Sequence, residues 1–116
     1  MIEESFFRDI EEQEHVDIEV EKKNKSCILI NHYQVYENKR GDGIGSSVMN
    51  NIIEMCENED DIDKIEMHIG LTWRGDDGFP VDKKIENDPT IRFLLKHDFN
   101  LIDYGADRTV LAKRSV

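Results

Sequence analysis

Three glycines at alternate positions, Gly41, Gly43 and Gly45, lie between an apolar, β-rich run and a well-patterned helical stretch. The first turn of a helix has backbone N–H groups without intrahelical partners and the positive end of the helix dipole. Glycines at that point let an anion approach the backbone closely. The stretch from Val35 to Ser47 therefore predicts phosphate binding between a strand and a helix.

Two common phosphate-binding motifs do not fit this stretch. A Walker loop requires Lys followed by Ser or Thr after its last glycine, and the chain has no such pair there. The Rossmann fingerprint requires a glycine three residues after its second one, where this chain has Val48. What fits is Arg40 followed at fixed spacing by Gly43 and Gly45. A glycine-rich turn before an ordinary helix is the alternative interpretation.

The eleven residues from Val35 to Gly45, V-Y-E-N-K-R-G-D-G-I-G, resemble the acetyl-CoA motif of the GNAT N-acetyltransferase superfamily, V-x-P-x-x-R-G-x-G-I-G. The spacing is intact, and Glu37 stands where the family has proline. The end of the chain also resembles very compact, phage-type acetyltransferases. The resemblance covers residues 28–113.

A second stretch, residues 87–99, is similar to another family hallmark, N-x-x-A-x-x-F-Y-x-K-x-G-F. The matching positions are Asn87, Phe93, Lys96 and Phe99. Two separate matches in the same order as in the family favour the resemblance over the simple turn.

The resemblance implies an N-acetyltransferase that transfers an acetyl group from acetyl-CoA to a primary amine, with a protein lysine among the acceptors. Acetyl-CoA would be the cosubstrate, and no metal is expected. The backbone of one strand residue would pair with the pantetheine arm, and the glycine turn would hold the pyrophosphate. Asn87 would hold the far end of the arm or, alternatively, cap the next helix, while the Arg40 side chain could simply be solvated. The implied cofactor-binding residues are Val35, Arg40, Gly41, Asp42, Gly43, Ile44, Gly45, Ser46 and Asn87.

The expected proton-transfer residues depart from the family pattern. Leu94 stands where many members have a tyrosine that protonates the departing thiolate, and a leucine has no proton to donate. An ammonium cannot attack a thioester, so a base is needed as well. The strand before the glycines has no carboxylate, but it has His32, and an imidazole titrates near neutral pH. Glu66 and His68 on a neighbouring strand are the next candidates, and Tyr33, Tyr36 or Tyr104 could replace the missing acid.

These departures keep a second function open, a catalytically weak or inactive acyl-CoA-binding or protein-interaction module on the same fold. A third hypothesis is an acidic interaction protein that does not bind CoA. The net charge of −11 argues against direct binding of nucleic acid, which needs a basic face. It favours a cationic partner such as an amine or a lysine-bearing protein, although acidity also aids solubility.

The 116 residues predict a single domain, residues 1–116. Cys27 and Cys56 are interpreted as core residues in a reducing compartment, not as a disulfide framework or metal site. With no leader pattern and no long apolar run, we expect a cytoplasmic protein that does not enter a membrane. The family's usual pair of N-terminal helices would be reduced to one, so the acceptor site would be open or completed by a second subunit. Both monomer and homodimer are considered.

Apolar residues at helical spacing predict helices over residues 2–15, 44–57 and from 88 onward. Alternating or apolar runs predict strands over residues 16–20, 26–36, 64–69, 99–102 and 109–113, with a turn at 22–25. Residues 70–87 are the least regular part. The expected fold class is α/β (α+β), a GNAT-like mixed and mostly antiparallel sheet with helices on both faces. Its two central strands should splay apart near Val35 and Ile69.

Overall fold

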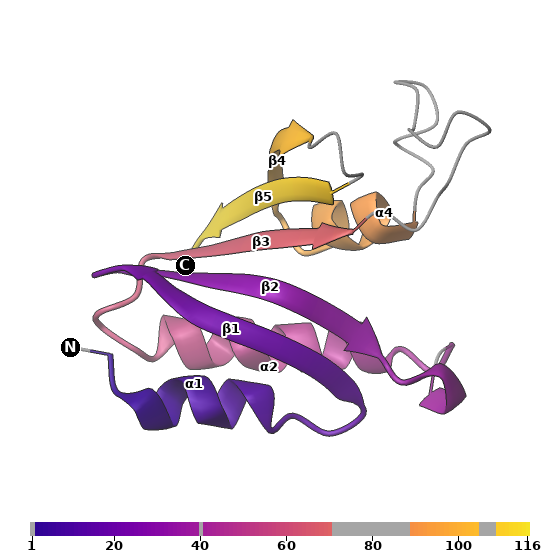
Figure 1. Cartoon of the computed structure of the whole chain (residues 1–116), viewed down its shortest axis with the longest axis horizontal. Helices are drawn as coiled ribbons and strands as arrows, with labels where there is room; N and C mark the ends of the chain where they lie inside the picture. The colour runs from indigo at the N-terminus through magenta and orange to yellow at the C-terminus, as the bar shows by residue number, and fades with distance from the viewer. Residues whose placement is uncertain (1, 40, 71–88, 105–108) are drawn as a thin grey trace.

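The computed structural model describes residues 2–39, 41–70, 89–104 and 109–116 (Figure 1). Five strands form one sheet in the order β1-β2-β3-β5-β4. None of the helices in these ranges is long and apolar enough to cross a membrane. In chain order the elements are α1 (Glu4–Glu11), β1 (Val16–Asn24), β2 (Cys27–Val35), the 3-10 turn η1 (Glu37–Lys39), α2 (Ile44–Glu57), β3 (Lys64–Gly70), α4 (Pro89–Lys96), β4 (Asn100–Tyr104) and β5 (Thr109–Ser115).

The sheet is mixed because one central pair of strands is parallel. β2 and β3 pair in parallel, and the chain passes between them through α2. Every other neighbouring pair is antiparallel. A parallel pair needs a crossover connection, and an amphipathic helix of this length supplies it while covering the sheet. The predicted crossover, the predicted closing hairpin and the bounds of α2 are confirmed.

The N-terminal elements differ from the prediction at their ends. The first helix is shorter than residues 2–15, because the chain leaves α1 at Glu11 and turns sharply at His15, which has a φ of 70°. β1 is longer than residues 16–20 and continues through the expected turn, with Lys22 opposite Ile28. Charged side chains are tolerated there because β1 lies at the edge of the sheet, where their ends reach water.

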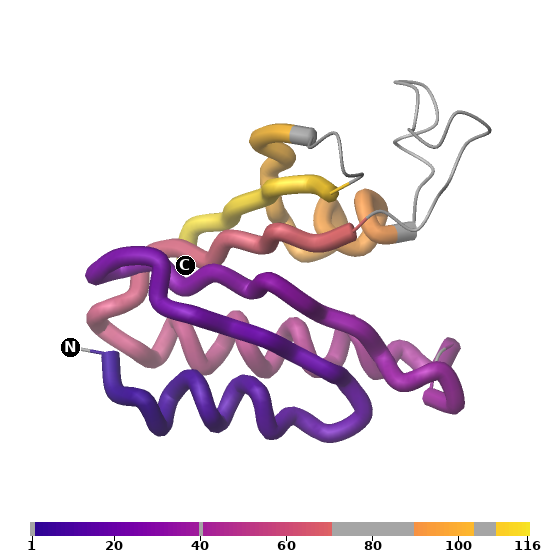
Figure 2. Tube along the Cα trace, in the orientation of Figure 1, coloured from indigo at the N-terminus to yellow at the C-terminus, as the bar shows by residue number. Residues whose placement is uncertain are grey.

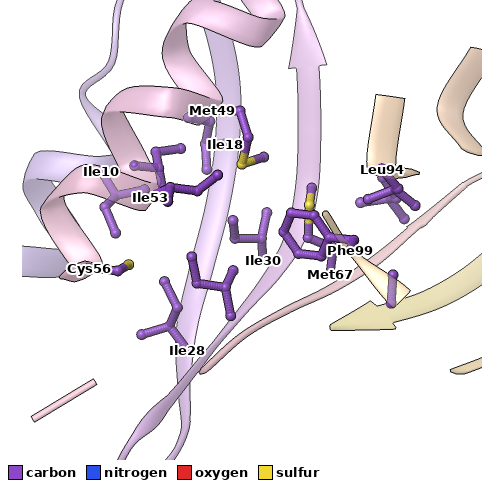
Figure 3. Packing of buried hydrophobic residues seen from close by; sticks show 14 of the residues in the cluster. Ile10, Ile18, Ile28, Ile30, Met49, Ile53, Cys56, Met67, Leu94 and Phe99 are labelled. Carbon is purple, nitrogen blue, oxygen red and sulfur yellow. The ribbon is translucent and has the colours of Figure 1, made fainter. Parts of the chain in front are cut away.

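One face of the sheet carries the core. Pairing brings Ile30 beside Met67 and Met67 beside Ala112, so the buried residues of neighbouring strands point the same way. Side chains from α1, α2 and α4 pack on this face in one cluster (Figure 3). Its members include Ile10, Ile18, Ile28, Ile30, Met49, Ile53, Cys56, Met67, Leu94 and Phe99.

The expectation of helices on both faces is not met within the described residues. α1 runs beside α2 beneath β1 and β2 (Figure 2), and Gln13 Nε2, just after α1, lies 3.7 Å from Met55 Sδ in α2. The opposite face of the sheet carries exposed polar residues such as Glu19, His68 and Lys113. A helix is stabilised by burying an apolar stripe, and the outward positions of these strands offer too little apolar surface for one.

The two central strands separate before they end. Their ladder runs from Cys27 beside Lys64 to Ile30 beside Met67 and goes no further. β2 nevertheless continues to Val35 and β3 to Gly70, and the strands diverge visibly toward those ends (Figure 1). The predicted splay near Val35 and Ile69 is confirmed.

A polar network links β1, β2 and β3 on the face of the sheet that none of the described helices covers, hereafter the helix-free face. Glu66 is buried, and its carboxylate accepts hydrogen bonds from Lys23 Nζ and, at 3.2 Å, from the Cys27 thiol. Burial, the Glu66 hydrogen bond and the Glu66 charge raise the pKa of Cys27 to about 12, so this thiol stays protonated. Burial by itself would raise the pKa of Glu66. The hydrogen bonds from Lys23 and Cys27 and the charges of Lys23 and Lys113 outweigh it and lower this pKa below its ordinary value.

Glu66→Gln should reduce the loss of unfolding free energy at acid pH, which is the acid limb of the curve of stability against pH. Because the folded pKa of Glu66 is lower than the ordinary 4.5, its ionised form adds stability above that value. This contribution is lost as the pH falls through the folded pKa. Urea unfolding measured from about pH 6 to about pH 3 should show a smaller loss of unfolding free energy for Glu66→Gln than for the wild type.

The matched control is Glu21→Gln, which changes an exposed glutamate in β1 on the same face. Glu21→Gln should leave the wild-type acid limb in place. Parallel acid limbs for the wild type and Glu66→Gln would contradict the lowered pKa of Glu66.

Candidate functional site

A pocket of about 330 Å³ lies where the central strands separate. Tyr33 and Val35 line it from β2, Ile69 from β3, and Thr90 and Phe93 from α4. The glycine turn, the first turn of α2 and Lys39 complete the lining. The two stretches that resemble the GNAT motifs therefore meet at one pocket, although Gly45 and Phe93 are 48 positions apart in the sequence.

The first turn of α2 offers backbone N–H groups to this pocket. Ser47 donates the first helical hydrogen bond, to the carbonyl of Gly43 at 3.0 Å. The N–H groups of Ile44, Gly45 and Ser46 precede it and have no acceptor within the helix. Gly43 precedes the helix at a φ of 75° and supplies no side-chain cap. A ligand anion is thus the natural partner for these donors.

The three glycines have two different roles. Gly41 and Gly43 have φ values of 91° and 75°, and a Cβ at either position would meet no atom within 4 Å. They are needed for the backbone turn and leave it open to a ligand. Gly45 is different, because a Cβ there would lie 3.1 Å from Val35 Cγ2. It lets the first turn of α2 pack directly against the end of β2.

Tyr33 closes the inner wall of the pocket. Its hydroxyl donates a hydrogen bond to the carbonyl of Gly45, and its ring packs against Phe93 with centroids 5.6 Å apart. Burial raises the pKa of the Tyr33 phenol, so it is neutral at physiological pH. Its proton is directed at α2. This arrangement argues against Tyr33 as the acid that replaces the family tyrosine, and Tyr36, the other described candidate, is half exposed and does not line the pocket.

The three candidate bases lie on the helix-free face, not in the pocket. His68 alternates with Met67 and Ile69, whose side chains face the helices. Its Nε2 lies 2.9 Å from Thr109 Oγ1, and His32 Nε2 lies 3.2 Å from Asp17 Oδ2. Both histidines follow the end of the β2–β3 ladder, where the strands have parted. Glu66 lies within the ladder, and both of its oxygens are already hydrogen-bonded.

Some site residues lie outside the described residues, and others were not anticipated. Arg40 and Asn87 belong to the first group, as does the side chain of Tyr104. The exposed Asp42 lies in the glycine turn as expected. Lys39 and Thr90 line the pocket but were not predicted. They adjoin the two recognised motifs, so closeness to a motif was the available signal. Among the described residues, no cluster of His, Cys, Asp and Glu could hold a metal.

Comparisons with known proteins bear on the fold. No protein-family model matches the sequence, and a search of curated proteins found no significant match. The structure resembles Ard1 from Thermoplasma volcanium, with a TM-score of 0.63 and 23% identity over 87% of this chain and 62% of that one. It also resembles Arabidopsis thaliana Naa50 in complex with the bisubstrate analogue CoA-Ac-MVNAL, with a TM-score of 0.56 and 21% identity over 87% of this chain and 64% of that one.

A third similar structure is a GNAT family acetyltransferase from Elizabethkingia anophelis with acetyl-CoA bound, with a TM-score of 0.57. It is 13% identical over 87% of this chain and 68% of that one. The chain spans less than two thirds of the length of the Ard1 and Naa50 chains. Identities this low establish architecture alone. With the separated central strands and the glycine turn before α2, they show that the chain has the GNAT acetyltransferase fold.

Proposed function

We propose that this protein is an N-acetyltransferase that transfers an acetyl group from acetyl-CoA to a primary amine. The observation that carries the proposal is the pocket between the separated strands, with the N-terminal donors of α2 at its edge. An extended arm ending in a pyrophosphate suits such a site, because the arm can pair with a strand while the anion meets helix N–H groups. The similar Elizabethkingia structure has acetyl-CoA bound.

We propose that the residues expected from the family resemblance hold acetyl-CoA. Val35 lines the pocket where the arm would extend β2, and residues 40–46 would hold the pyrophosphate through their backbone. As the resemblance implies, Asn87 would hold the far end of the arm. The glycine turn fits this role, since Gly41 and Gly43 leave open space where other residues would place a Cβ.

The proposed reaction needs one proton to leave the acceptor before bond formation. A base removes it from the ammonium, and the amine nitrogen then attacks the thioester carbonyl. A C–N bond forms and the C–S bond breaks, and the second proton of the nitrogen passes through water to the departing thiolate. We propose His68 or His32 as the base, since both lie beyond the point where the strands part. Glu66 is less suited, because its lowered pKa makes it a weak base.

The proposed acceptor is a cationic amine, with a protein lysine as one candidate. A net charge of −11 attracts cationic partners over a long range. Naa50, which the structure resembles, is in complex with an analogue that joins CoA to the peptide MVNAL. The helix-free face beside His32 and His68 would give a macromolecular acceptor room to approach. We propose that this takes place in the cytoplasm.

A second candidate is a catalytically weak or inactive acyl-CoA-binding module. Leu94 occupies the family tyrosine position and is fully buried in the core, not turned toward the pocket. The Tyr33 hydroxyl is bonded to Gly45. Neither residue can protonate a thiolate without rearranging, which favours this alternative. Incubating the protein with acetyl-CoA and candidate amines, followed by mass spectrometry, separates the two.

Gly43→Asp should abolish most acetyl-CoA binding, while Gly43→Asn retains it. The two side chains have nearly the same shape, and both tolerate the positive φ better than other residues do. They differ by one negative charge beside the proposed pyrophosphate site. We expect Gly43→Asp to bind at least about tenfold more weakly than Gly43→Asn by calorimetry. Equal affinities in two folded variants would overturn the assigned site.

Replacing His32 and His68 by Gln should lower turnover far more than affinity for acetyl-CoA, because the imidazoles would act on the acceptor. A loss of about 10²-fold in kcat is expected when the true base is removed. The two single variants show which histidine is responsible. Unchanged turnover in the double variant would exclude both as the base.

Leu94→Tyr should destabilise the fold and leave the thiolate without a new acid. The added phenol must fit into a site that is 0% exposed, which costs about 1–3 kcal/mol of unfolding free energy. Leu95→Tyr is the matched control, since Leu95 is the next residue of α4 and is 49% exposed. Denaturant unfolding should separate the two variants. A stable Leu94→Tyr variant with raised turnover would show instead that this position opens to the sulfur.

A further inference from the structure

The C-terminal end of α4 contacts Ser46 in the first turn of α2. Ser46 lies in that turn and lines the pocket. Lys96 Nζ and His97 Nε2, one in the last residue of α4 and one just after it, each lie 3.2 Å from Ser46 Oγ. Lys96 and His97 follow Ser46 by 50 and 51 positions in the sequence, so only the fold brings these side chains together.

The protonation state of His97 Nε2 determines where the hydroxyl proton of Ser46 points. The lysine ammonium can only donate, so Ser46 Oγ accepts from Lys96. In the neutral tautomer with its proton on Nδ1, His97 Nε2 accepts the Ser46 proton and holds the hydroxyl away from the pocket. When Nε2 carries a proton, it donates to Ser46, and the hydroxyl proton is free to point at a ligand.

The surroundings of His97 favour the neutral imidazole when no anion is bound. The residue is 6% exposed, and burial, then the charges of Lys96 and Arg114, lower its pKa, while Asp98 opposes them. Arg114 on β5 also donates to the His97 carbonyl at 2.7 Å, and the Phe93 ring packs 4.8 Å away on α4. Ser46 is the group that faces His97 from α2.

An anion at the first turn of α2 would reverse this balance. Its negative charge stabilises a nearby imidazolium, and a protonated His97 has a proton on both ring nitrogens. Nε2–H then donates to Ser46, and the freed hydroxyl donates to a phosphate oxygen. The proton added to His97 comes from the solvent.

We propose that His97 is a positioning residue for the phosphate-binding turn, and that binding of a pyrophosphate ligand is coupled through Ser46 to proton uptake at His97. This inference rests on the proposed function, because it requires a pyrophosphate at the N-terminus of α2. It adds a proton-linked control of cofactor affinity, exerted from α4. Affinity should rise as the pH falls through the pKa of His97 in the complex, and level off below its pKa in the free protein.

The test uses dephospho-CoA, whose pyrophosphate keeps a constant charge across this pH range. Calorimetry in two buffers of different ionisation enthalpy measures proton uptake directly. The wild type should take up a fraction of a proton, and its affinity should increase between about pH 8 and about pH 6 by up to about tenfold per unit of pKa shift. Wild-type binding without proton uptake would overturn the inference.

Two variants separate positioning from simple packing. His97→Gln places a permanent N–H donor near the position of Nε2, so it should retain affinity and lose both proton uptake and pH dependence. Ser46→Ala should weaken binding and lose part of the proton uptake, because the hydroxyl that links Nε2 to the anion is gone while the charge effect on the imidazole remains. Ser47→Ala, which changes an exposed serine one residue further along α2, should behave as wild type.

The outcomes distinguish this inference from the function it rests on. Proton uptake that persists in His97→Gln, or at the wild-type level in Ser46→Ala, would overturn the coupling while acetyl-CoA binding stands. Should His97→Gln fail to fold, the Ser46→Ala comparison still tests the route. Wild-type protein that binds neither dephospho-CoA nor acetyl-CoA would overturn the proposed function and the coupling with it.

Discussion

The early end of the β2–β3 ladder is the constraint on which the candidate site depends. Had pairing continued past Ile30 and Met67, backbone hydrogen bonds would have closed the space where the pocket lies. The first turn of α2 is instead attached to the end of β2. Gly45 allows contact with Val35, and the Tyr33 hydroxyl donates to the Gly45 carbonyl. These contacts fix the free N–H groups of α2 beside the gap between β2 and β3. They also keep that gap open on the side of the sheet where the helices pack.

Because the core packs on one face of the sheet, the gap between β2 and β3 opens onto two different surfaces. The helix side has the pocket and the N-terminal donors of α2. The other side has His32 and His68 and is polar. In the proposed reaction, acetyl-CoA would occupy the first side and the amine would approach from the second, so that the strands separate the two substrates except at the gap.

The charge of the molecule is distributed in keeping with this division. The chain carries 26 acidic and 15 basic residues, yet Lys39 lines the pocket and Lys96 contacts Ser46 beside it. An exposed acidic row, Asp17, Glu19 and Glu21, runs along β1 on the helix-free face. Local cations at a helix N-terminus favour an anionic ligand, whereas the acidic remainder favours a cationic partner.

Much of the architecture was readable in the sequence because it depends on local periodicity and turn chemistry. Helical spacing gave the bounds of α2, and the glycine turn located the candidate anion site. The hairpin, the parallel crossover and the splay followed from the order of the elements and the family resemblance. The lengths of α1 and β1 did not follow, because an edge strand tolerates charges that otherwise indicate a turn.

Tertiary structure alone decided which side chains meet. The sequence by itself determined that Ser46 begins a helix and that His97 follows another, but not that their side chains lie 3.2 Å apart. It offered Glu66 as a base, whereas the fold surrounds that carboxylate with Lys23 and Cys27 and lowers its pKa. It left the orientation of Leu94 open, and packing placed it in the core. Helical and strand periods report which face a residue occupies, but contacts and pKa values depend on neighbours that only the folded chain brings together.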